Sequence, residues 1–284
     1  MPPSKLPPSA RQRRLGAELR RLREHAGLSA TGASALLGAT QSRVSNIEAG
    51  RYAVSADRVR SIAHSYTCTD QALIDALAGM SGGRTRGWWE EYREILPSGA
   101  LDLAEIEHHA ASMHITSVIH MPGLLQTGEH ARAVISDAVP PLAPPDVEHR
   151  VSHRIKRQAV LYRDDPTPLT AIVHEAALRM GFGGRTVARA QLEHLIEMGE
   201  RKHISVLVIP FGAGTFPGSG QSTVYFCGPV AQLDTVQLDT DHGSEFLDAP
   251  AQLVKYRTVL DRMEKSALNP AKSRALIRRI AQDN

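Results

Sequence analysis

The sequence predicts two domains of different fold class, an N-terminal all-α domain of five helices and a C-terminal mixed α/β (α+β) domain. Three observations support this division. Apolar residues recur at helical spacing through residues 10–80, and capping residues precede the segments. Strand-like apolar runs begin only after residue 114. Between the two regions, SGGRTRG at 81–87 has the composition of a linker.

The first helix is predicted to begin at Ala10 and to end at Gly27. Its apolar residues recur at intervals of four, three and four, as Leu15, Leu19, Leu22 and Ala26. Gly27 is typical of a C-terminal cap, because glycine readily adopts the left-handed backbone found there. The preceding residues 1–9 are rich in Pro and Ser and are expected to form a disordered tail.

Four further short helices are predicted in the N-terminal domain. Each follows a side chain that is able to cap a helix, namely Ser29, Thr40, Ser55 and Thr69. The second helix ends at about Leu37, and Gly38 then permits a tight turn. The third helix ends at about Ala49, before Gly50.

Helical and strand-like patterns are mixed in the C-terminal domain, residues 88–284. Helices are predicted at about 88–96, 102–113, 128–136, 146–163, 186–199, 250–266 and 270–282. Apolar runs typical of strands occur at 115–119, 169–173, 204–209, 223–227 and 236–238. The order of these elements favours a mixed α/β or α+β fold.

The composition excludes several classes of protein. A hydrophobic fraction of 42% with 22% charged residues is ordinary for a globular protein. Cys68 and Cys227 are too few for a disulfide framework or a zinc module, and they fit a reducing cytoplasm. The longest apolar run, 204–211, is far shorter than the ~20 residues of a membrane helix. We therefore expect a cytoplasmic protein without a membrane segment or a secretory signal.

Charge is distributed unevenly along the chain. The net charge is +3, yet residues 1–60 hold 11 Lys and Arg against four Asp and Glu. A basic N-terminal region on a mildly acidic remainder indicates a polyanionic partner at one end. A solvated charged surface is the alternative, which charge alone does not exclude.

The segment 28–50, LSATGASALLGATQSRVSNIEAG, has the helix, glycine-containing turn and second helix of a helix-turn-helix. Val44 and Ile47 are expected to pack inward together with Leu36 and Leu37. The opposite side of this third helix then displays Gln41, Ser42, Ser45 and Asn46. Such side chains can donate to and accept from base edges, as Gln and Asn do with adenine.

Residues 10–80, and LGATQSRVSNIEAG in particular, resemble the phage-repressor (Cro/C1-type, XRE-like) class of helix-turn-helix domain. The resemblance implies that the third helix enters the major groove of double-stranded DNA. It implies base-reading positions at Gln41, Ser42 and Asn46, and positions at or near phosphate at Thr40, Arg43 and Arg51. It also implies an ion pair between Arg23 and Glu48. The second helix departs from the family, because ATGAS replaces a pattern like QEELA.

The remainder resembles the C-terminal domain of actinomycete helix-turn-helix regulators. The matching segments include WWEEYREILP, IHMPGLLQTGEHARAVI and ISVLVIPFGAG. Those regulators are often encoded beside a small partner protein, and some are antitoxin-like. The resemblance implies a regulatory domain but no particular ligand.

Several C-terminal residues have two possible interpretations. A possible partner or ligand surface would comprise Gln126, Arg150, Arg154, Arg157 and Glu175. For the three arginines, the preferred interpretation is a solvated stripe opposite Val147, Val151 and Ile155. The glycine-rich loop 211–220 lacks the Lys-Ser/Thr of a P-loop and is expected to be a flexible loop or lid.

Neither a metal site nor a catalytic site is predicted. The histidines His108, His109, His114 and His120 lack the spacing and the nearby acid of a metal motif. No catalytic constellation has recognisable local context, so we expect neither an enzyme nor a cofactor.

The sequence therefore predicts a sequence-specific DNA-binding transcription regulator. A homodimer on an inverted repeat is expected, because one recognition helix reads few base pairs. The C-terminal domain would modulate DNA binding through a small partner protein or a small-molecule ligand. The alternative is an antitoxin-like protein whose main role is to bind a small cognate partner, with DNA binding for autoregulation.

Overall fold

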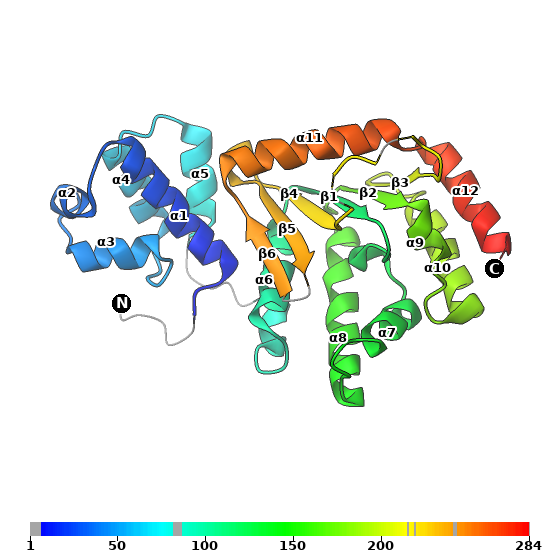
Figure 1. Ribbon diagram of the computed structural model, residues 1–284. Helices are drawn as coiled ribbons and strands as arrows, with labels where there is room; N and C mark the ends of the chain where they lie inside the picture. Colours follow the sequence, from blue (N-terminus) through cyan, green and yellow to red (C-terminus); the bar gives the residue numbers. More distant parts are fainter. Residues whose placement is uncertain (1–6, 82–86, 215, 219, 241–242, 284) are drawn as a thin grey trace. The chain divides into compact units, whose positions relative to one another are not determined.

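The chain folds into two compact units in a computed structural model, Met1–Glu90 and Glu91–Asn284. The structure describes residues 7–81, 87–214, 216–218, 220–240 and 243–283 (Figure 1). Most of the predicted tail 1–9 and of the predicted linker 81–87 lies outside these residues, as do two positions of the glycine-rich loop. The predicted fold class, a five-helix domain followed by a mixed α/β domain, is confirmed for the described residues.

The described part of the first unit contains five α-helices, each with a capping side chain. The helices are α1 (Ala10–His25), α2 (Ala30–Leu36), α3 (Gln41–Glu48), α4 (Ala56–Ser65) and α5 (Gln71–Gly79). Ser29, Thr40 and Ser55 cap α2 to α4 as predicted. The predicted cap Thr69 is wrong: the Asp70 carboxylate accepts from the Leu73 N–H at 3.0 Å and caps α5. Ser9, assigned to the tail, caps α1.

Helix α1 approaches the end of α3 closely. A Cβ atom on Gly16 would lie 2.3 Å from the Glu48 carbonyl oxygen, so this contact requires glycine. Val44 and Ile47 are buried as predicted. The prediction that Leu36 packs with them is wrong, because its side chain is 53% exposed. Leu36 and Leu37 are consecutive, so a helix projects them in different directions, and the end of α2 cannot bury both.

The second unit is built on one six-stranded sheet in its described part, with the order β3-β2-β1-β4-β5-β6. Its strands are β1 (Ser112–Ser117), β2 (Leu169–His174), β3 (Ile204–Ile209), β4 (Thr223–Cys227), β5 (Thr235–Thr240) and β6 (Gly243–Leu247). Strands β1, β2 and β3 are parallel, whereas β4, β5 and β6 join by antiparallel pairing. The short, polar strand β6 was missed, because only its pairing with β5 identifies it.

Helices cover both faces of the sheet (Figure 1). The α-helices are α6 (Ser98–His109), α7 (Gly128–Ser136), α8 (Pro144–Arg157), α9 (Glu175–Arg179), α10 (Gly184–Met198), α11 (Pro250–Ser266) and α12 (Pro270–Asp283). The described residues also form four 3-10 helices, η1 (Trp88–Tyr92), η2 (Gly123–Leu125), η3 (Gln158–Leu161) and η4 (Ala231–Leu233), of which η1 spans the boundary between the two units. Helix α11 lies on one face, and α10 and α12 lie on the other. No helix in the described ranges has both the length and the apolar character that a membrane span requires.

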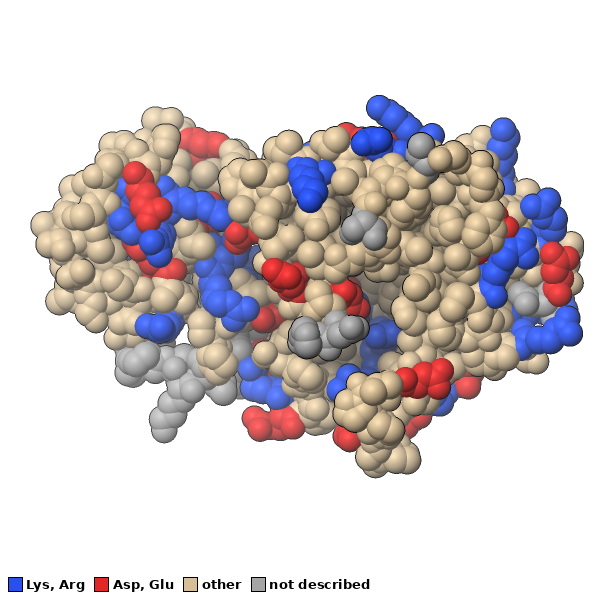
Figure 2. Space-filling model, in the orientation of Figure 1, with Lys and Arg blue, Asp and Glu red and all other residues tan. Residues whose placement is uncertain are grey.

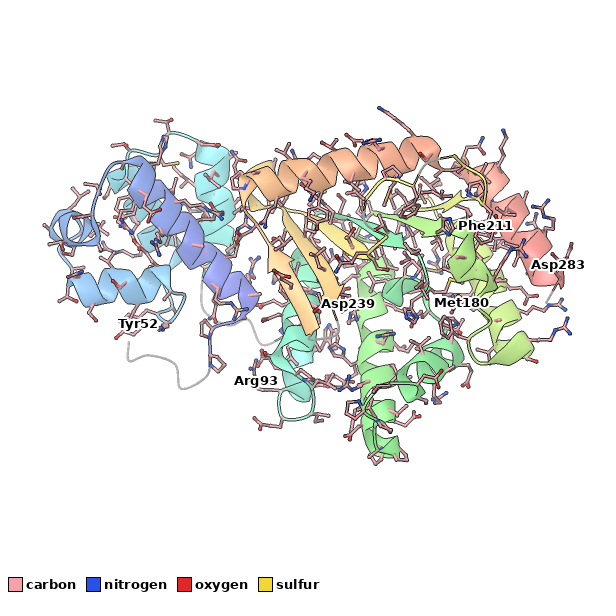
Figure 3. The ribbon with its side chains drawn as sticks, viewed as in Figure 1. Tyr52, Arg93, Met180, Phe211, Asp239 and Asp283 are labelled. Carbon is pink, nitrogen blue, oxygen red and sulfur yellow. The ribbon has the colours of Figure 1, made fainter. Side chains whose placement is uncertain are left out.

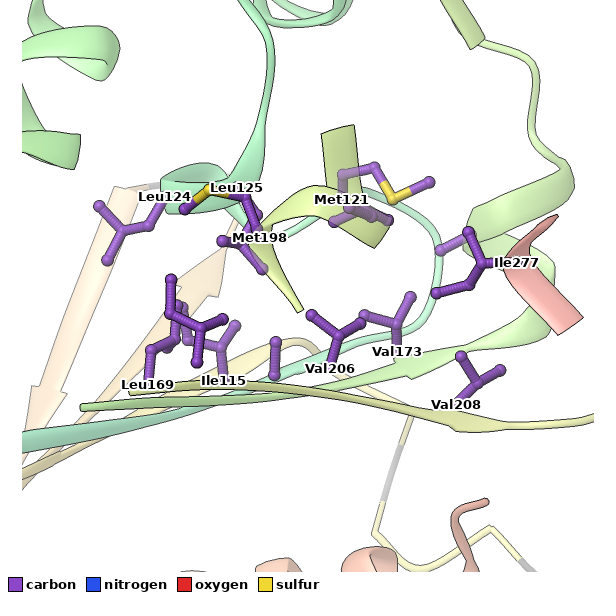
Figure 4. Packing of buried hydrophobic residues seen from close by; sticks show 14 of the residues in the cluster. Ile115, Met121, Leu124, Leu125, Leu169, Val173, Met198, Val206, Val208 and Ile277 are labelled. Atoms are coloured by element: carbon purple, nitrogen blue, oxygen red, sulfur yellow. The ribbon is translucent and has the colours of Figure 1, made fainter. Parts of the chain in front are cut away.

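The main core lies between the sheet and the α10–α12 face (Figure 4). Ile115, Val173 and Val206 project from neighbouring strands toward Met198 and Ile277 of the helices. On the opposite face, residues of β4 and β5 pack against α11. The burial of each apolar side chain of this size stabilises the folded state by about 1.5–3 kcal/mol.

Three predicted boundaries are wrong. The helix predicted at 88–96 is the short 3-10 helix η1, which ends at Tyr92. The helix predicted at 102–113 is α6, which ends at His109, because Ser112–Ser117 pair with β2 and β4 instead. The helix predicted at 146–163 is α8, which ends at Arg157 and tightens into η3. Sheet pairing, which is not local in sequence, determines the end of α6.

Candidate nucleic-acid interface

The turn between α2 and α3 fixes the direction of α3. Gly38 has a φ angle of +59°, in the left-handed region that side chains disfavour. Arg58, on α4, donates from Nη2 to the Leu37 carbonyl oxygen at 3.0 Å, which satisfies a free group at the end of α2. Thr40 Oγ1 accepts from the Arg43 N–H at 3.2 Å and starts α3.

One side of α3 is exposed and polar, as predicted. Val44 and Ile47 anchor the helix in the core, and this leaves the side chains of Gln41, Ser42, Arg43 and Ser45 exposed. The Gln41 amide makes no hydrogen bond to any described residue, so both its donor and its acceptor are available to a partner.

Asn46 is more constrained than the other predicted base-reading residues. It is half-buried, and its Nδ2 donates to the Ser42 carbonyl oxygen at 2.9 Å. Its Oδ1 accepts from Arg51 Nη1 at 3.5 Å. The backbone carbonyl of Asn46 also accepts from the N–H groups of Arg51 and Tyr52. Asn46 therefore links the end of α3 to the following loop, where Figure 3 shows Tyr52.

Arg43 and Arg51 are the two described arginines of the first unit without an acidic or backbone-carbonyl partner. Arg43 is exposed and unpaired among the described residues, and Arg51 contacts only Asn46. The other described arginines of this unit form ion pairs with carboxylates or donate to backbone carbonyls: Arg11, Arg13, Arg14, Arg20, Arg21, Arg23, Arg58 and Arg60. Among the described arginines of the first unit, Arg43 on α3 and Arg51 just after it are therefore the cations available to bind phosphate.

The predicted ion pair between Arg23 and Glu48 is present. Arg23 donates from Nε and Nη2 to the two carboxylate oxygens at 2.6 and 3.0 Å, and both side chains are below 10% exposure. Arg23 Nη1 also donates to the Leu28 carbonyl oxygen at 2.7 Å. The hydrogen bond to Glu48 raises the pKa of Arg23. This bidentate pair joins α1 to the end of α3.

The prediction of a solvated arginine stripe on α8 is wrong for Arg154 and Arg157. Arg157 donates to both oxygens of the buried Glu107 carboxylate at 2.6 and 2.7 Å. Arg154 donates from Nη1 to Gln126 Oε1 at 2.8 Å. Arg150 is only half-buried, and Ile155, expected to face inward, is 39% exposed. Two of the three cations therefore face the interior of the unit.

Glu175 is buried at the start of α9. Its Oε2 accepts from the Phe211 N–H at 2.9 Å, and its Oε1 accepts from Arg179. Burial raises the pKa of Glu175, but these hydrogen bonds outweigh burial and leave it below the ordinary value. Glu175 thus ties the end of β3 to α9, although Phe211 itself is exposed (Figure 3).

Sequence reasoning missed three polar residues of the second unit: Glu107, His130 and Asp239. The pattern of α6 gave no sign that Glu107 would be buried, because its partner Arg157 is 50 positions away. Among the described residues, no group of three or more His, Cys, Asp or Glu side chains is arranged to hold a metal ion.

Comparison with protein families matches residues 14–77 to a helix-turn-helix domain and residues 100–279 to a domain of unknown function (DUF5753). Comparison with curated proteins and with solved structures found no match. The first match supports DNA binding and transcription regulation by the first unit. Because the second match covers more than half of the chain, the protein belongs to the DUF5753 family, with a helix-turn-helix domain at its N-terminus.

Proposed function

We propose that this protein is a sequence-specific transcription regulator of the Cro/C1 type, and that α3 lies in the major groove of its operator. One observation carries the proposal: the exposed polar side of α3 is flanked by Arg43 and Arg51, which lack acidic partners in the described structure. Gln41 and its neighbours would contact base edges, whereas the arginines would contact phosphates. The role is binding rather than catalysis.

The same proposal includes a homodimer and a regulatory second unit. A single recognition helix contacts only a few base pairs, so two copies on an inverted repeat would give the required specificity. The second unit would respond to a small partner protein or to a small-molecule ligand and thereby change the affinity for DNA. Such a protein would act in the cytoplasm, where its operator is.

Gln41→Ala is expected to relax the preference at one base pair of each half-site. Gln41 is exposed and makes no hydrogen bond to any described residue, so its loss leaves α3 intact. A bidentate contact to adenine discriminates by about 1–3 kcal/mol. Fluorescence-anisotropy titrations on an operator, first located by footprinting, and on its single-base variants would measure the effect. An unchanged base preference would remove Gln41 from the reading positions.

Arg43→Ala is expected to weaken binding to specific and non-specific DNA alike. Loss of one phosphate contact should also reduce the slope of log K against log salt by about one. Arg20→Ala is the matched control, because Arg20 lies on α1 and pairs with Glu24. If Arg43→Ala and Arg20→Ala had the same salt slope as the parent protein, the proposed orientation of α3 would be wrong.

A further inference from the structure

Arg154 is a partly enclosed cation with a neutral partner. Its only hydrogen bond among the described residues goes to Gln126 Oε1, at 2.8 Å, and no described carboxylate lies within ion-pair distance. Burial lowers the pKa of Arg154 to about 10. A guanidinium removed from water is costly unless an anion compensates it. Its remaining N–H groups, on Nε and Nη2, have no hydrogen-bond partner among the described residues.

The orientation of this guanidinium is fixed by a chain of hydrogen bonds. Gln126 is 2% exposed, and its Nε2 donates to the Met121 carbonyl oxygen at 2.8 Å, so its Oε1 must face Arg154. Gln158 donates to the Gln126 carbonyl oxygen at 2.6 Å and holds the same segment. Arg154 is therefore positioned in advance for a partner, which reduces the entropy lost on binding.

A second unsatisfied polar group lies near Arg154. His130 is 2% exposed, and neither of its ring nitrogens has a hydrogen-bond partner among the described residues. Buried polar groups in folded proteins nearly always have such partners. Burial, with smaller contributions from His120 and Arg154, lowers the pKa of His130 to about 4, so the ring is neutral at pH 7.

An aromatic surface lies against His130, and His120 within it is near enough to Arg154 for the arginine charge to lower the pKa of His120. Phe182 stacks on His120, with ring centroids 5.0 Å apart, and forms a T-shaped pair with His130, with ring centroids 5.8 Å apart. His120 is exposed and lies three residues beyond the end of β1. Flat apolar molecules favour stacking on such rings.

These residues gather where the sheet changes from parallel to antiparallel. In open α/β sheets, ligands bind beyond the carboxyl ends of the parallel strands. His120 follows the carboxyl end of β1, and Asp239, on β5, is close enough to influence the pKa values of His120 and Arg154. Figure 2 shows the surface hollowed beside β5, with Lys or Arg atoms at its margin, and Figure 3 shows Asp239 at this place.

We propose that this hollow binds a small aromatic carboxylate, with Arg154 holding the carboxylate and His130 and Phe182 contacting the ring and its substituents. A planar guanidinium fork matches a carboxylate. A singly charged anion fits better than phosphate, because Arg157 is already paired with Glu107 and the exposed Asp239 would repel a dianion. The ligand class deepens the regulatory part of the proposed function, and only its effect on DNA rests on that function.

Isothermal titration calorimetry on the full chain tests the proposal with benzoate, benzamide and inorganic phosphate at pH 7. We expect saturable binding of benzoate, at least tenfold tighter than that of benzamide, which has the same shape without the charge. Phosphate should bind at least tenfold more weakly than benzoate. Equal affinities for benzoate and benzamide would overturn the proposal. So would the absence of saturable benzoate binding at concentrations up to about 20 mM.

Variants then locate the site. Arg154→Gln should reduce benzoate affinity at least tenfold, because the charged fork is lost. Arg189→Gln, which removes an exposed arginine paired with Glu193 on α10, should bind benzoate like the parent protein. Because Arg154→Gln could disturb folding, Arg154→Lys with an unchanged circular-dichroism spectrum provides a second variant, and it should also bind more weakly. Parent-like binding by both Arg154 variants would overturn the assignment.

The ligand proposal and the DNA proposal can fail separately. Calorimetry with benzoate needs no DNA, so failure of operator binding would leave its result intact. If both hold, saturating benzoate should change operator affinity by at least threefold in the parent protein but not in Arg154→Gln. An unchanged affinity in the parent protein would remove the regulatory role and leave a ligand site alone.

Discussion

Arg23→Ala is expected to lower the free energy of unfolding of the first unit by about 3–5 kcal/mol and to abolish specific DNA binding. The substitution leaves the Glu48 carboxylate buried without its bidentate partner, and removing one member of a buried pair costs this much. The Leu28 carbonyl oxygen loses a donor as well. A domain of ordinary stability has only about 5–15 kcal/mol in total.

Hydrogen exchange measured by mass spectrometry on the full chain would report this loss for the amides of α1 and α3. Because α3 is held against α1 through Glu48, both helices should lose protection together. The matched control is Arg20→Ala, which breaks the exposed pair with Glu24 on α1 and should change stability by less than about 1 kcal/mol. Equal protection in Arg23→Ala and Arg20→Ala would mean that the buried pair contributes little.

Local signals in the sequence predicted most of the first unit. Capping side chains act on backbone groups three residues away, so Ser29, Thr40 and Ser55 are recognisable without tertiary information. The Thr69 error has the same origin, because Thr69 and Asp70 are adjacent and both are good caps. The polar side of α3 followed from helical periodicity. The engagement of the Asn46 amide by Ser42 and Arg51 did not, since it depends on side-chain rotamers.

The α8 error shows where periodicity alone fails. Extending the spacing of Val147 and Val151 by four placed Ile155 inside, whereas the buried side of the helix continues through Arg154 and Gln158. A helix has 3.6 residues per turn, so an interval of three is as consistent as one of four. Because isoleucine is more hydrophobic than arginine, the prediction placed Ile155 rather than Arg154 on the buried side. Glu107 and Gln126, which make an inward arginine acceptable, lie on distant segments that the sequence could not place.

Lowering the pH is expected to destabilise the second unit, and the loss should begin at pH values well above those at which carboxylates titrate. Burial, Arg157, Arg154 and Lys156 lower the pKa of His153 to about 3, and the pKa of His130 is about 4. In the unfolded chain both rings titrate near 6.5. Between these values the unfolded state binds protons that the folded state does not. The stabilisation that these two neutral histidines contribute is therefore fully present above pH 6.5, and it declines as the pH falls below that value.

Each histidine contributes about 1.4 kcal/mol per pH unit below 6.5, so the pair should lower the free energy of unfolding by about 4 kcal/mol between pH 7 and pH 5. Urea unfolding at several pH values in this range would measure the slope. His153→Phe keeps the edge contact with Tyr92, 5.1 Å between ring centroids, and should remove about half of the slope. His149→Gln, exposed on the same helix, should leave it unchanged. A slope that His153→Phe did not reduce would mean that His153 takes up its proton in the folded state, with water or an acid reaching a ring that lies buried beside Tyr92.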